Sequence, residues 1–242
     1  MHTNFSDGKN SVNEMAEEAS KLSYDIIAFS DHVWKTTNWV SEYVDEIKRT
    51  QERIGRKIKL LTALEAKLIN FNGEMDIKDD DLKKIDFLIG AVHSIPIDKS
   101  GKERVRVVEE NCKLLEIKGE IKEPEEILKY WEKATFSILK NKSVSVLAHP
   151  LRIPKVLNQR ISKTLKESIV EEAIRMNKII EINTYCKADD EFLEIIERKK
   201  PMILVGSDSH SIDFLRSRFS INKKLCLRFQ HQIKKALEKL GV

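Results

Sequence analysis

The chain has 242 residues, of which 41% are hydrophobic and 34% charged, so it is too apolar to be disordered and fits a single α/β domain over residues 1–242. Its 43 basic and 39 acidic residues give a net charge of +4, too small to indicate nucleic-acid binding by itself. No stretch approaches the roughly 18 apolar residues of a membrane span and no signal-peptide pattern is present, so we expect a cytoplasmic protein.

Short apolar runs alternate with longer amphipathic segments along the chain. Ser11 followed by Glu14 is typical of a helix capping box, and Pro124 is typical of a helical first turn. In chain order we expect a helix over 11–22, a strand over 25–31, a helix over 38–54, strands over 57–66 and 85–94, a helix over 124–139, a strand over 144–150, a helix over 162–176, a strand over 179–184, a helix over 189–197 and a strand over 202–210. This order predicts a parallel sheet or a closed (β/α) barrel.

Three further features belong to no predicted strand or helix of this series. A polar insertion over residues 98–123 is expected to be a helical excursion or a mobile flap. The basic segment over residues 223–235 is interpreted as the solvated face of a final helix. The cysteines Cys112, Cys186 and Cys226 are odd in number and far apart, which predicts neither a disulfide scaffold nor a zinc ribbon and fits a reducing compartment. No glycine-rich phosphate loop is present.

Histidines and acids stand where the predicted strands end. Because the C-terminal ends of parallel strands open on one face, we expect these side chains to meet there. Four of the six histidines end or directly follow a strand, whereas His231 in the final basic helix is interpreted as a surface residue. The strand-end residues are His32, Glu65, His93, His149 and Asp208, with His210 two positions later.

A buried group of imidazoles and carboxylates needs a compensating positive charge, and metal ions commonly supply it. The absence of cysteine from the set favours zinc, manganese or iron over a thiolate-bound structural zinc. The first turn adds His2 and Asp7, although Asp7 in S-D-G taken alone is an ordinary turn residue. One catalytic ion takes at most about four protein ligands, so this larger set predicts two or three ions. The candidate ligands are His2, Asp7, His32, Glu65, His93, His149, Asp208 and His210.

The ordered motifs H-T-x-x-S-D-G, S-D-H, A-L-E, A-V-H-S, A-H-P, E-I-N and G-S-D-S-H resemble those of the PHP family, named for polymerase and histidinol phosphatase. The resemblance runs from His2 to His210. It implies a distorted (β/α)7 barrel with a trinuclear metal site that hydrolyses phosphate esters through a metal-activated water. It also implies a partition of the ligands: Asp7, His32 and His210 on one ion, His93 and His149 on a second, His2 and Asp208 on the third, and Glu65 bridging the second and third.

Several residues near these motifs have candidate roles. Arg152 is expected to bind the non-bridging phosphate oxygens in a fork, so that Glu65, Asp208, His210 and Arg152 form the candidate catalytic group. Asn183 could orient a ligand or the substrate, and Asp31 could support an imidazole. Trp34 and Trp39 either line the pocket or pack against the fold, the second being the commoner arrangement for large rings.

The chain departs from the family pattern in two places. Ala63 replaces the usual glycine of the G-x-E motif, a change of small consequence for the backbone. Family members open with a strand that ends in H-x-H, and the first of those histidines would fall one residue before Met1. We therefore expect the true start to lie upstream, with codons for a short apolar strand ending D-x-H. Otherwise the third ion should bind weakly, with the Met1 amine as a makeshift ligand.

Three functions are compatible with these residues. The leading hypothesis is a phosphatase acting on a small phosphomonoester, with histidinol phosphate as the named candidate. The second is a phosphodiesterase or exonuclease acting on nucleotide or nucleic-acid ends, for which the basic final helix is a weak indication. The third is a barrel with weakened catalysis and a scaffold or regulatory role. Specificity in this architecture depends on loops such as 98–123, which carry no readable motif.

Overall fold

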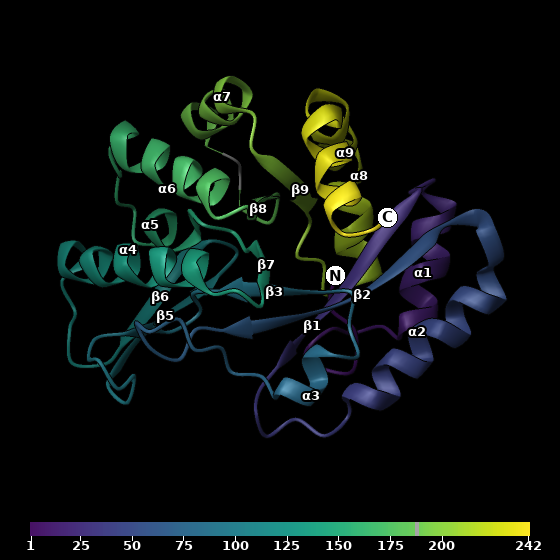
Figure 1. Ribbon diagram of the computed structural model, residues 1–242, viewed down its shortest axis with the longest axis horizontal. Helices are drawn as coiled ribbons and strands as arrows, with labels where there is room; N and C mark the ends of the chain where they lie inside the picture. Colours follow the sequence, from purple (N-terminus) through teal and green to yellow (C-terminus); the bar gives the residue numbers. More distant parts are fainter. Residues whose placement is uncertain (187–188) are drawn as a thin grey trace.

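A parallel sheet of six strands forms the centre of the molecule (Figure 1). The structure is a computed structural model that describes residues 1–186 and 189–242. The strands neighbour one another in chain order, which confirms the six predicted strands and their parallel arrangement. They are β1 (Ile26–Val33), β2 (Lys59–Lys67), β3 (Phe87–Ala91), β7 (Val144–Leu147), β8 (Ile179–Asn183) and β9 (Met202–Gly206).

Helices connect the strands and cover the sheet, and the five predicted helices are confirmed (Figure 1). The capping box is formed as predicted, since Ser11 Oγ accepts the Glu14 amide and the Glu14 carboxylate accepts the Ser11 amide. Pro124 stands in the first turn of its helix. In the described part of the chain, no helix is long and apolar enough to cross a membrane. The five predicted helices are α1 (Val12–Lys21), α2 (Val40–Ile54), α4 (Pro124–Lys140), α6 (Lys163–Arg175) and α7 (Asp190–Lys199).

The basic C-terminal segment forms two helices where one was expected. Its lysines and His231 are exposed, which confirms the solvated face, while Ala236 on the opposite side is buried. Three short elements also lie outside the predicted series. The additional helices are α8 (Ile212–Arg228), α9 (Gln230–Lys239), α3 (Asp79–Leu82), α5 (Arg152–Val156) and the 3₁₀ turn η1 (Gly55–Lys57).

The two faces of the sheet have separate apolar clusters. Leu60 and Leu64 of β2 belong to the large cluster under the outer helices, whereas Leu61 and Ala63 belong to a small inner cluster that α9 joins through Ala236. Successive side chains of a strand point to opposite faces. Positions 61, 63 and 65 of β2, positions 26, 28, 30 and 32 of β1, and positions 179 and 181 of β8 therefore face inward. The inner cluster and the candidate ligands on these strands lie on one face because they occupy alternate positions of the same strands.

The first residues of the chain join the two outer strands of the sheet. The Met1 amine donates to Ala28 O at 3.1 Å and Ser30 Oγ at 3.0 Å, and Met1 O accepts the Ser30 amide at 2.8 Å. The His2 amide donates to Ser209 O, just past β9, at 2.9 Å. The N-terminus therefore lies between β1 and the end of β9, and the sheet curls so that its two edges approach one another (Figure 1).

The polar insertion is a β-structure, so the predicted helical excursion is wrong. Val105 and Val107 are buried on either side of the exposed Arg106, and this period of two builds a strand where the polar composition had suggested a helix. Arg104 anchors the insertion by donating to Ser94 Oγ at 2.7 Å and to Leu68 O at 2.5 Å. The antiparallel strands are β4 (Ile95–Pro96), β5 (Arg104–Glu110) and β6 (Lys113–Lys118).

A disulfide joins Cys112 to Cys186, although the number and spacing of the cysteines had predicted no disulfide scaffold. The two residues are 74 positions apart in sequence, but their Cα atoms are 5.8 Å apart because the β5–β6 hairpin folds over the loop that follows β8. Cys226 is free and exposed. The separation of the two cysteines in sequence therefore does not indicate their distance in space, because the insertion folds back and brings Cys112 next to Cys186.

Candidate metal centre

The carboxylate of Glu65 lies at the centre of the cluster. Its Oε1 is 2.7 Å from His93 Nε2 and 3.1 Å from His149 Nε2, and its Oε2 is 3.4 Å from His2 Nε2. The Glu65 side chain is only 5% exposed. Glu65 pairs in register with His32 of the neighbouring strand, which is why A-L-E and S-D-H, 33 positions apart in the chain, reach the same site.

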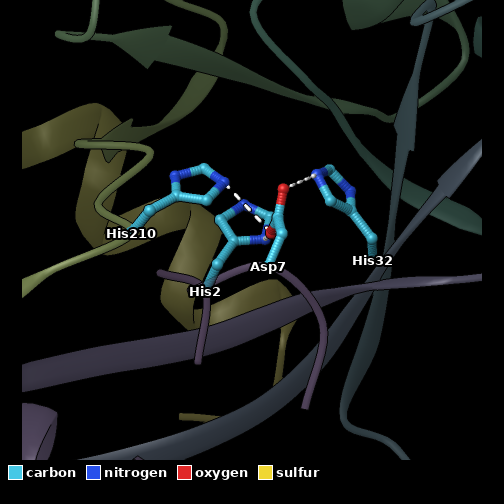
Figure 2. Close-up of side chains that lie close together, drawn as sticks. All are labelled: His2, Asp7, His32 and His210. Carbon is cyan, nitrogen blue, oxygen red and sulfur yellow. Dashed lines mark ion pairs between the residues drawn. The ribbon is translucent and has the colours of Figure 1, made fainter. Parts of the chain in front are cut away.

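A second group surrounds Asp7 (Figure 2). His210 Nε2 lies 3.2 Å from Asp7 Oδ1, and His32 Nε2 lies 3.6 Å from Asp7 Oδ2. The His2 ring stacks on the His210 ring with centroids 4.2 Å apart. The three residues that the family resemblance assigned to one ion are thus together, and His2 joins them within 4.8 Å.

His2 also belongs to a third group, with Glu65 and Asp208. Its Nε2 is 3.1 Å from Asp208 Oδ1. The structure therefore brings all eight candidate ligands to one rim of the sheet. The resemblance placed His93 with His149, and their rings are 5.2 Å apart around the same oxygen of Glu65, although the geometry also groups His93 with His32.

A buried aspartate holds the first turn in place. Asp31 accepts hydrogen bonds from the amide and hydroxyl of Thr3, at 2.8 and 3.0 Å, and from those of Ser6, at 3.2 and 2.7 Å. A Cβ at Gly8 would lie 2.5 Å from the carbonyl oxygen of His2, so the turn closes only with glycine. Asp31 therefore orients the segment that carries two candidate ligands, whereas the sequence had suggested that it supports an imidazole.

Two candidate ligands have left-handed backbones, His149 with φ of 25° and Asp208 with φ of 52°. Glu181 Oε2 accepts the His149 amide at 2.7 Å and so stabilises this conformation. Asn183 Nδ2 donates to the other oxygen of Glu181 at 3.2 Å. A Cβ at Gly206 would lie 1.7 Å from Glu181 Oε1, so glycine there leaves room for the carboxylate. Asn183 thus acts through Glu181, a residue that the sequence reasoning did not single out.

Burial and close pairing shift the pKa values of the cluster. Burial by itself would lower the pKa of His2, but hydrogen bonds to Asp208 and Glu65 raise it to about 10. Burial lowers the pKa of His32 to about 3. Burial favours the neutral form of Glu65, yet the charge of His93 and hydrogen bonds from the surrounding histidines hold its pKa well below the usual range. Close pairing between acids and imidazoles thus lowers the pKa of Glu65 and raises that of His2.

The donor atoms fit a divalent metal. Among the described side chains, Nδ1 of His2 is buried without a hydrogen-bond partner, and its nearest acid, Asp7, is 3.8 Å away. A buried nitrogen of this kind is rare unless a ligand or ion satisfies it. Imidazole nitrogens and carboxylate oxygens without sulfur suit zinc, manganese or iron.

Arg152 begins α5 and reaches the acidic side of the cluster. Its Nη1 donates to Asp208 Oδ2 at 3.2 Å, its Nη2 pairs with Glu109, and its guanidinium lies 5.3 Å over the ring of Tyr185. Burial opposes the charge of this guanidinium, but Asp208, Glu109 and Glu65 outweigh the burial and raise its pKa. Arg152 is therefore a fixed cation beside the candidate ligands.

A cavity of about 480 Å³ opens beside the cluster between α5, α6 and α7. Its wall includes His149, Arg152 and Glu181 on the side of the cluster and Asn158 and Phe192 farther out. A space of this size is typical of sites for small organic ligands. The cavity and the candidate ligands therefore share one side of the molecule.

The two tryptophans have different surroundings. Trp39 packs on Phe5 and Tyr43, each with ring centroids 5.6 Å apart, as expected for a ring that packs against the fold. Trp34 is 40% exposed and lies 6.3 Å from the His32 ring. Only Trp34 is therefore placed at the edge of the cluster.

Comparison with known proteins gives one family match. The model of the PHP domain family matches residues 1–185. "Probable phosphatase" of Acetivibrio thermocellus is 26% identical over 227 residues, which cover 88% of this chain and 78% of the relative. DNA polymerase/3'-5' exonuclease PolX of Bacillus subtilis is 25% identical over 232 residues, covering 89% of this chain. The chain spans only 34% of the length of that polymerase.

A solved structure has the same fold. The histidinol phosphate phosphatase of Lactococcus lactis, in complex with zinc, L-histidinol and phosphate, matches with a TM-score of 0.65. The match covers 100% of this chain and 92% of that protein at 19% sequence identity. The curled parallel sheet with its helices is thus the fold of that phosphatase, as the resemblance of the motifs implied.

Proposed function

Because this chain belongs to the PHP domain family and is a hydrolase of phosphate esters, we propose that it cleaves a small phosphomonoester, in the manner of a histidinol phosphatase. The main support is one observation. Eight histidine and acidic side chains converge on one rim of the sheet, and one of them, His149, also lines a cavity of about 480 Å³. That combination suits a phosphoryl group at the rim with its organic part in the cavity.

Two or three divalent ions are the proposed cofactor, held by the eight candidate ligands. When bound, such ions lower the pKa of a coordinated water and neutralise the phosphoryl oxygens. Glu65 contacts three histidines at once and would connect the groups of ligands. Asp208 and His210 complete the rim on the side of β9.

Arg152 is the proposed anchor for the phosphoryl group. Its contacts with Asp208 and Glu109 use two N–H groups, and a guanidinium carries five, so others are free to donate to phosphoryl oxygens in a fork. Because its side chain is only 23% exposed, bulk water competes little for these bonds. Arg152 thereby orients the ester with its leaving group toward the cavity.

An exonuclease function is the second candidate, and the similarity to PolX of Bacillus subtilis favours it. The exposed basic face of α8 and α9 is a further, weak indication. Against it, the cavity has the size for one compact organic group. A catalytically weakened scaffold is the third candidate, and a measurement of the metal content distinguishes it from the two enzymatic candidates.

Metal analysis combined with a phosphoester panel tests the proposal. The purified protein is loaded with zinc, manganese or iron, its metal content is measured, and its rates on phosphomonoesters and short single-stranded oligonucleotides are compared at several salt concentrations. We expect two or three ions per chain and activity on the monoesters. A metal content near zero would support the scaffold instead, and activity confined to oligonucleotides and falling steeply with salt would support the exonuclease.

A further inference from the structure

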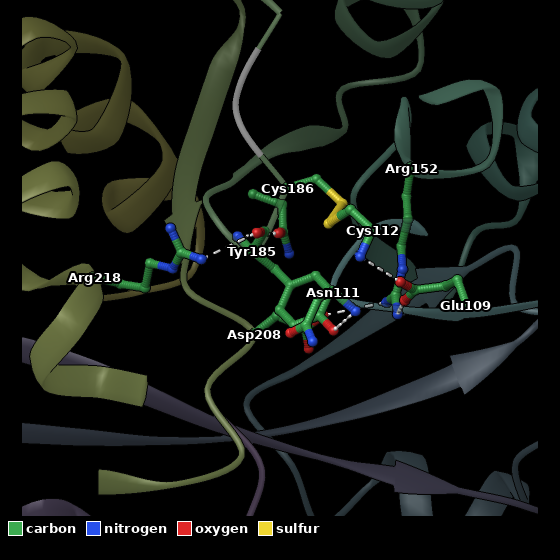
Figure 3. Close-up of a disulfide and its surroundings, with 9 residues drawn as sticks. Glu109, Asn111, Cys112, Arg152, Tyr185, Cys186, Asp208 and Arg218 are labelled. Carbon is green, nitrogen blue, oxygen red and sulfur yellow. Dashed lines mark hydrogen bonds and ion pairs between the residues drawn. A yellow bond between two sulfur atoms is a disulfide. The ribbon is translucent and has the colours of Figure 1, made fainter. Parts of the chain in front are cut away.

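The β5–β6 hairpin reaches into the candidate site through one acid (Figure 3). The Glu109 side chain, at the end of β5, is 8% exposed and pairs with Nη2 of Arg152. The other terminal nitrogen of the same guanidinium, Nη1, donates to Asp208 at 3.2 Å, and the guanidinium lies over the ring of Tyr185. The insertion thus supplies one of the groups that determine where Arg152 points.

The second oxygen of Glu109 ties the acid to the disulfide. Oε2 accepts the amide of Cys112 at 2.7 Å, and Cys112 is bonded covalently to Cys186 in the loop after β8. The neighbouring amide of Asn111 donates to the hydroxyl of Tyr185 at 3.2 Å. Glu109 therefore links two anchors, the disulfide on one side and the guanidinium on the other.

The hairpin turn has an unusual backbone for its sequence. Asn111 and Cys112 have φ of 52° and 62°, the left-handed pair of a tight two-residue hairpin. Asparagine tolerates this conformation, whereas cysteine adopts it rarely. The disulfide and the hydrogen bond to Glu109 both hold Cys112 in it. Release of the disulfide would remove one of these two restraints from the turn.

We propose that Glu109 is a positioning residue that directs Arg152 toward the phosphoryl group, and that the Cys112–Cys186 disulfide holds Glu109 in place to do so. The proposal rests on the proposed phosphatase function, because it assigns the task of Arg152. It makes phosphate binding depend on the oxidation state of the cysteine pair. The candidate metal ligands themselves need not change.

The redox step is an ordinary thiol–disulfide exchange. A dithiol reductant attacks one sulfur, the S–S bond breaks, and a second attack releases both cysteines as thiols while the reductant becomes a disulfide. The two electrons and two protons come from the reductant. Without the disulfide the turn is less restrained, the hydrogen bond from the Cys112 amide to Glu109 weakens, and Glu109 holds Arg152 less firmly.

The test uses the metal-loaded full chain and two readouts. One is KM and kcat on p-nitrophenyl phosphate, and the other is the Kd of inorganic phosphate by calorimetry. We expect Glu109→Gln to raise KM and Kd about tenfold with kcat within about threefold, because the acceptor of the Arg152 hydrogen bond loses its charge. The matched control is Glu110→Gln, the next residue and exposed, with both constants within about twofold.

A double-mutant cycle tests the link to the disulfide. Cys112→Ser/Cys186→Ser, or the wild type treated with dithiothreitol, should raise both constants by about three- to tenfold, whereas Cys226→Ser should leave them unchanged. Combined with Glu109→Gln, the cysteine substitutions should add less than about twofold, since both act through one contact. Circular dichroism and metal content confirm that each variant is folded and loaded.

Two results would overturn the inference. Unchanged KM and phosphate Kd in Glu109→Gln would show that the acid does not position Arg152. Fully additive effects of the cysteine and glutamate substitutions would show that the disulfide acts elsewhere. A wild type that turns over no phosphoester with any metal would instead refute the proposed function, while calorimetry on inorganic phosphate would still report on Glu109.

Discussion

At the scale of single residues, Glu65 lies between three histidines of the candidate site. It lies on the inward face of β2 two positions after Ala63, which is fully buried in the inner cluster. Its two oxygens contact three histidines that come from the N-terminal turn, the end of β3 and the end of β7. The A-L-E motif had indicated this acid, and the structure places it beside His32 of the neighbouring strand.

Substitution of Glu65 by glutamine should therefore disable the site. The amide keeps the shape but loses the charge that several imidazoles share, so we expect kcat/KM on a phosphomonoester to fall about 100-fold or more and the metal content to drop. Glu116→Gln, at an exposed acid of β6, is the control. Full metal content and full activity in Glu65→Gln would contradict the proposed role.

Gly206 allows a test of how Glu181 supports the site. It has no side chain and is not a candidate ligand, so its substitution removes no ligand. In Gly206→Ala the new Cβ meets the Glu181 carboxylate at 1.7 Å, so that carboxylate must move away from the His149 amide. We expect metal affinity to fall about tenfold or more. Gly206→Ala/Glu181→Ala removes the clash and should regain stability but not metal affinity. Recovery of both would mean that Glu181 has no part in holding His149.

At the scale of elements, an ion pair links the first helix to a late one. Arg216 of α8 donates to both oxygens of Glu18 of α1, at 2.7 and 2.9 Å. The two helices are 198 positions apart at this contact, and α1 follows the turn that carries two candidate ligands. The pair therefore contributes to holding the N-terminal segment against the rest of the fold.

This pair predicts a pH dependence of stability. The hydrogen bond from Arg216 lowers the pKa of Glu18 below its ordinary value of 4.5. A lowered pKa means that the pair stabilises the fold above pH 4.5 and that this contribution is lost as the pH falls through the lower, folded value. In urea unfolding, Arg216→Gln should be less stable than the wild type near pH 6, and the difference should shrink as the pH falls below 4.5 and Glu18 becomes protonated.

Arg175→Gln is the matched control for that experiment. Arg175 pairs with Glu172 within α6, so the substitution breaks a pair that joins no second element. Such pairs contribute little, and the urea midpoint should hardly change. An equal loss of stability in both variants, or a difference that persists at low pH, would contradict the role of the α1–α8 pair.

At the scale of the whole molecule, the candidate site is assembled from both ends of the chain. His2 and Asp7 near the start meet Asp208 and His210 near the end, and the His2 amide donates to Ser209. Metal binding should therefore stabilise the folded chain as a whole, because the ions would bind the fold and not the unfolded chain.

Thermal unfolding with and without a chelator measures this coupling. At a metal concentration of about 100 times Kd, binding adds about 2.7 kcal/mol, which for a chain of this size raises Tm by about 5–10 °C. Glu65→Gln should show a much smaller rise. If the Tm of the wild type changed with neither metal nor chelator, this result would argue against metal binding at the site.

Local patterns made much of this structure predictable. Strand and helix positions follow from periods of two and 3.6 and from caps such as Ser11, all of which are read within a few residues. The strand-end residues were predicted to meet because parallel strands open on one face, and the structure brings them together. Glu65 lies between groups of histidines, and His2 and His32 each join more than one group, so the expected partition of the ligands among the ions stays a prediction.

The remaining features depend on contacts between distant segments. By itself the sequence determined the order of the strands and helices, the parallel sheet and the chemical character of the rim, because these follow from local periodicity and strand polarity. Only the tertiary structure decided the β-hairpin, the Cys112–Cys186 bond and the positions of Glu109 and Glu181, since each depends on which loop another segment meets in space. Contacts between distant segments leave no periodic signal in the sequence, and they determine how the side chain of Arg152 and the backbone of His149 are held.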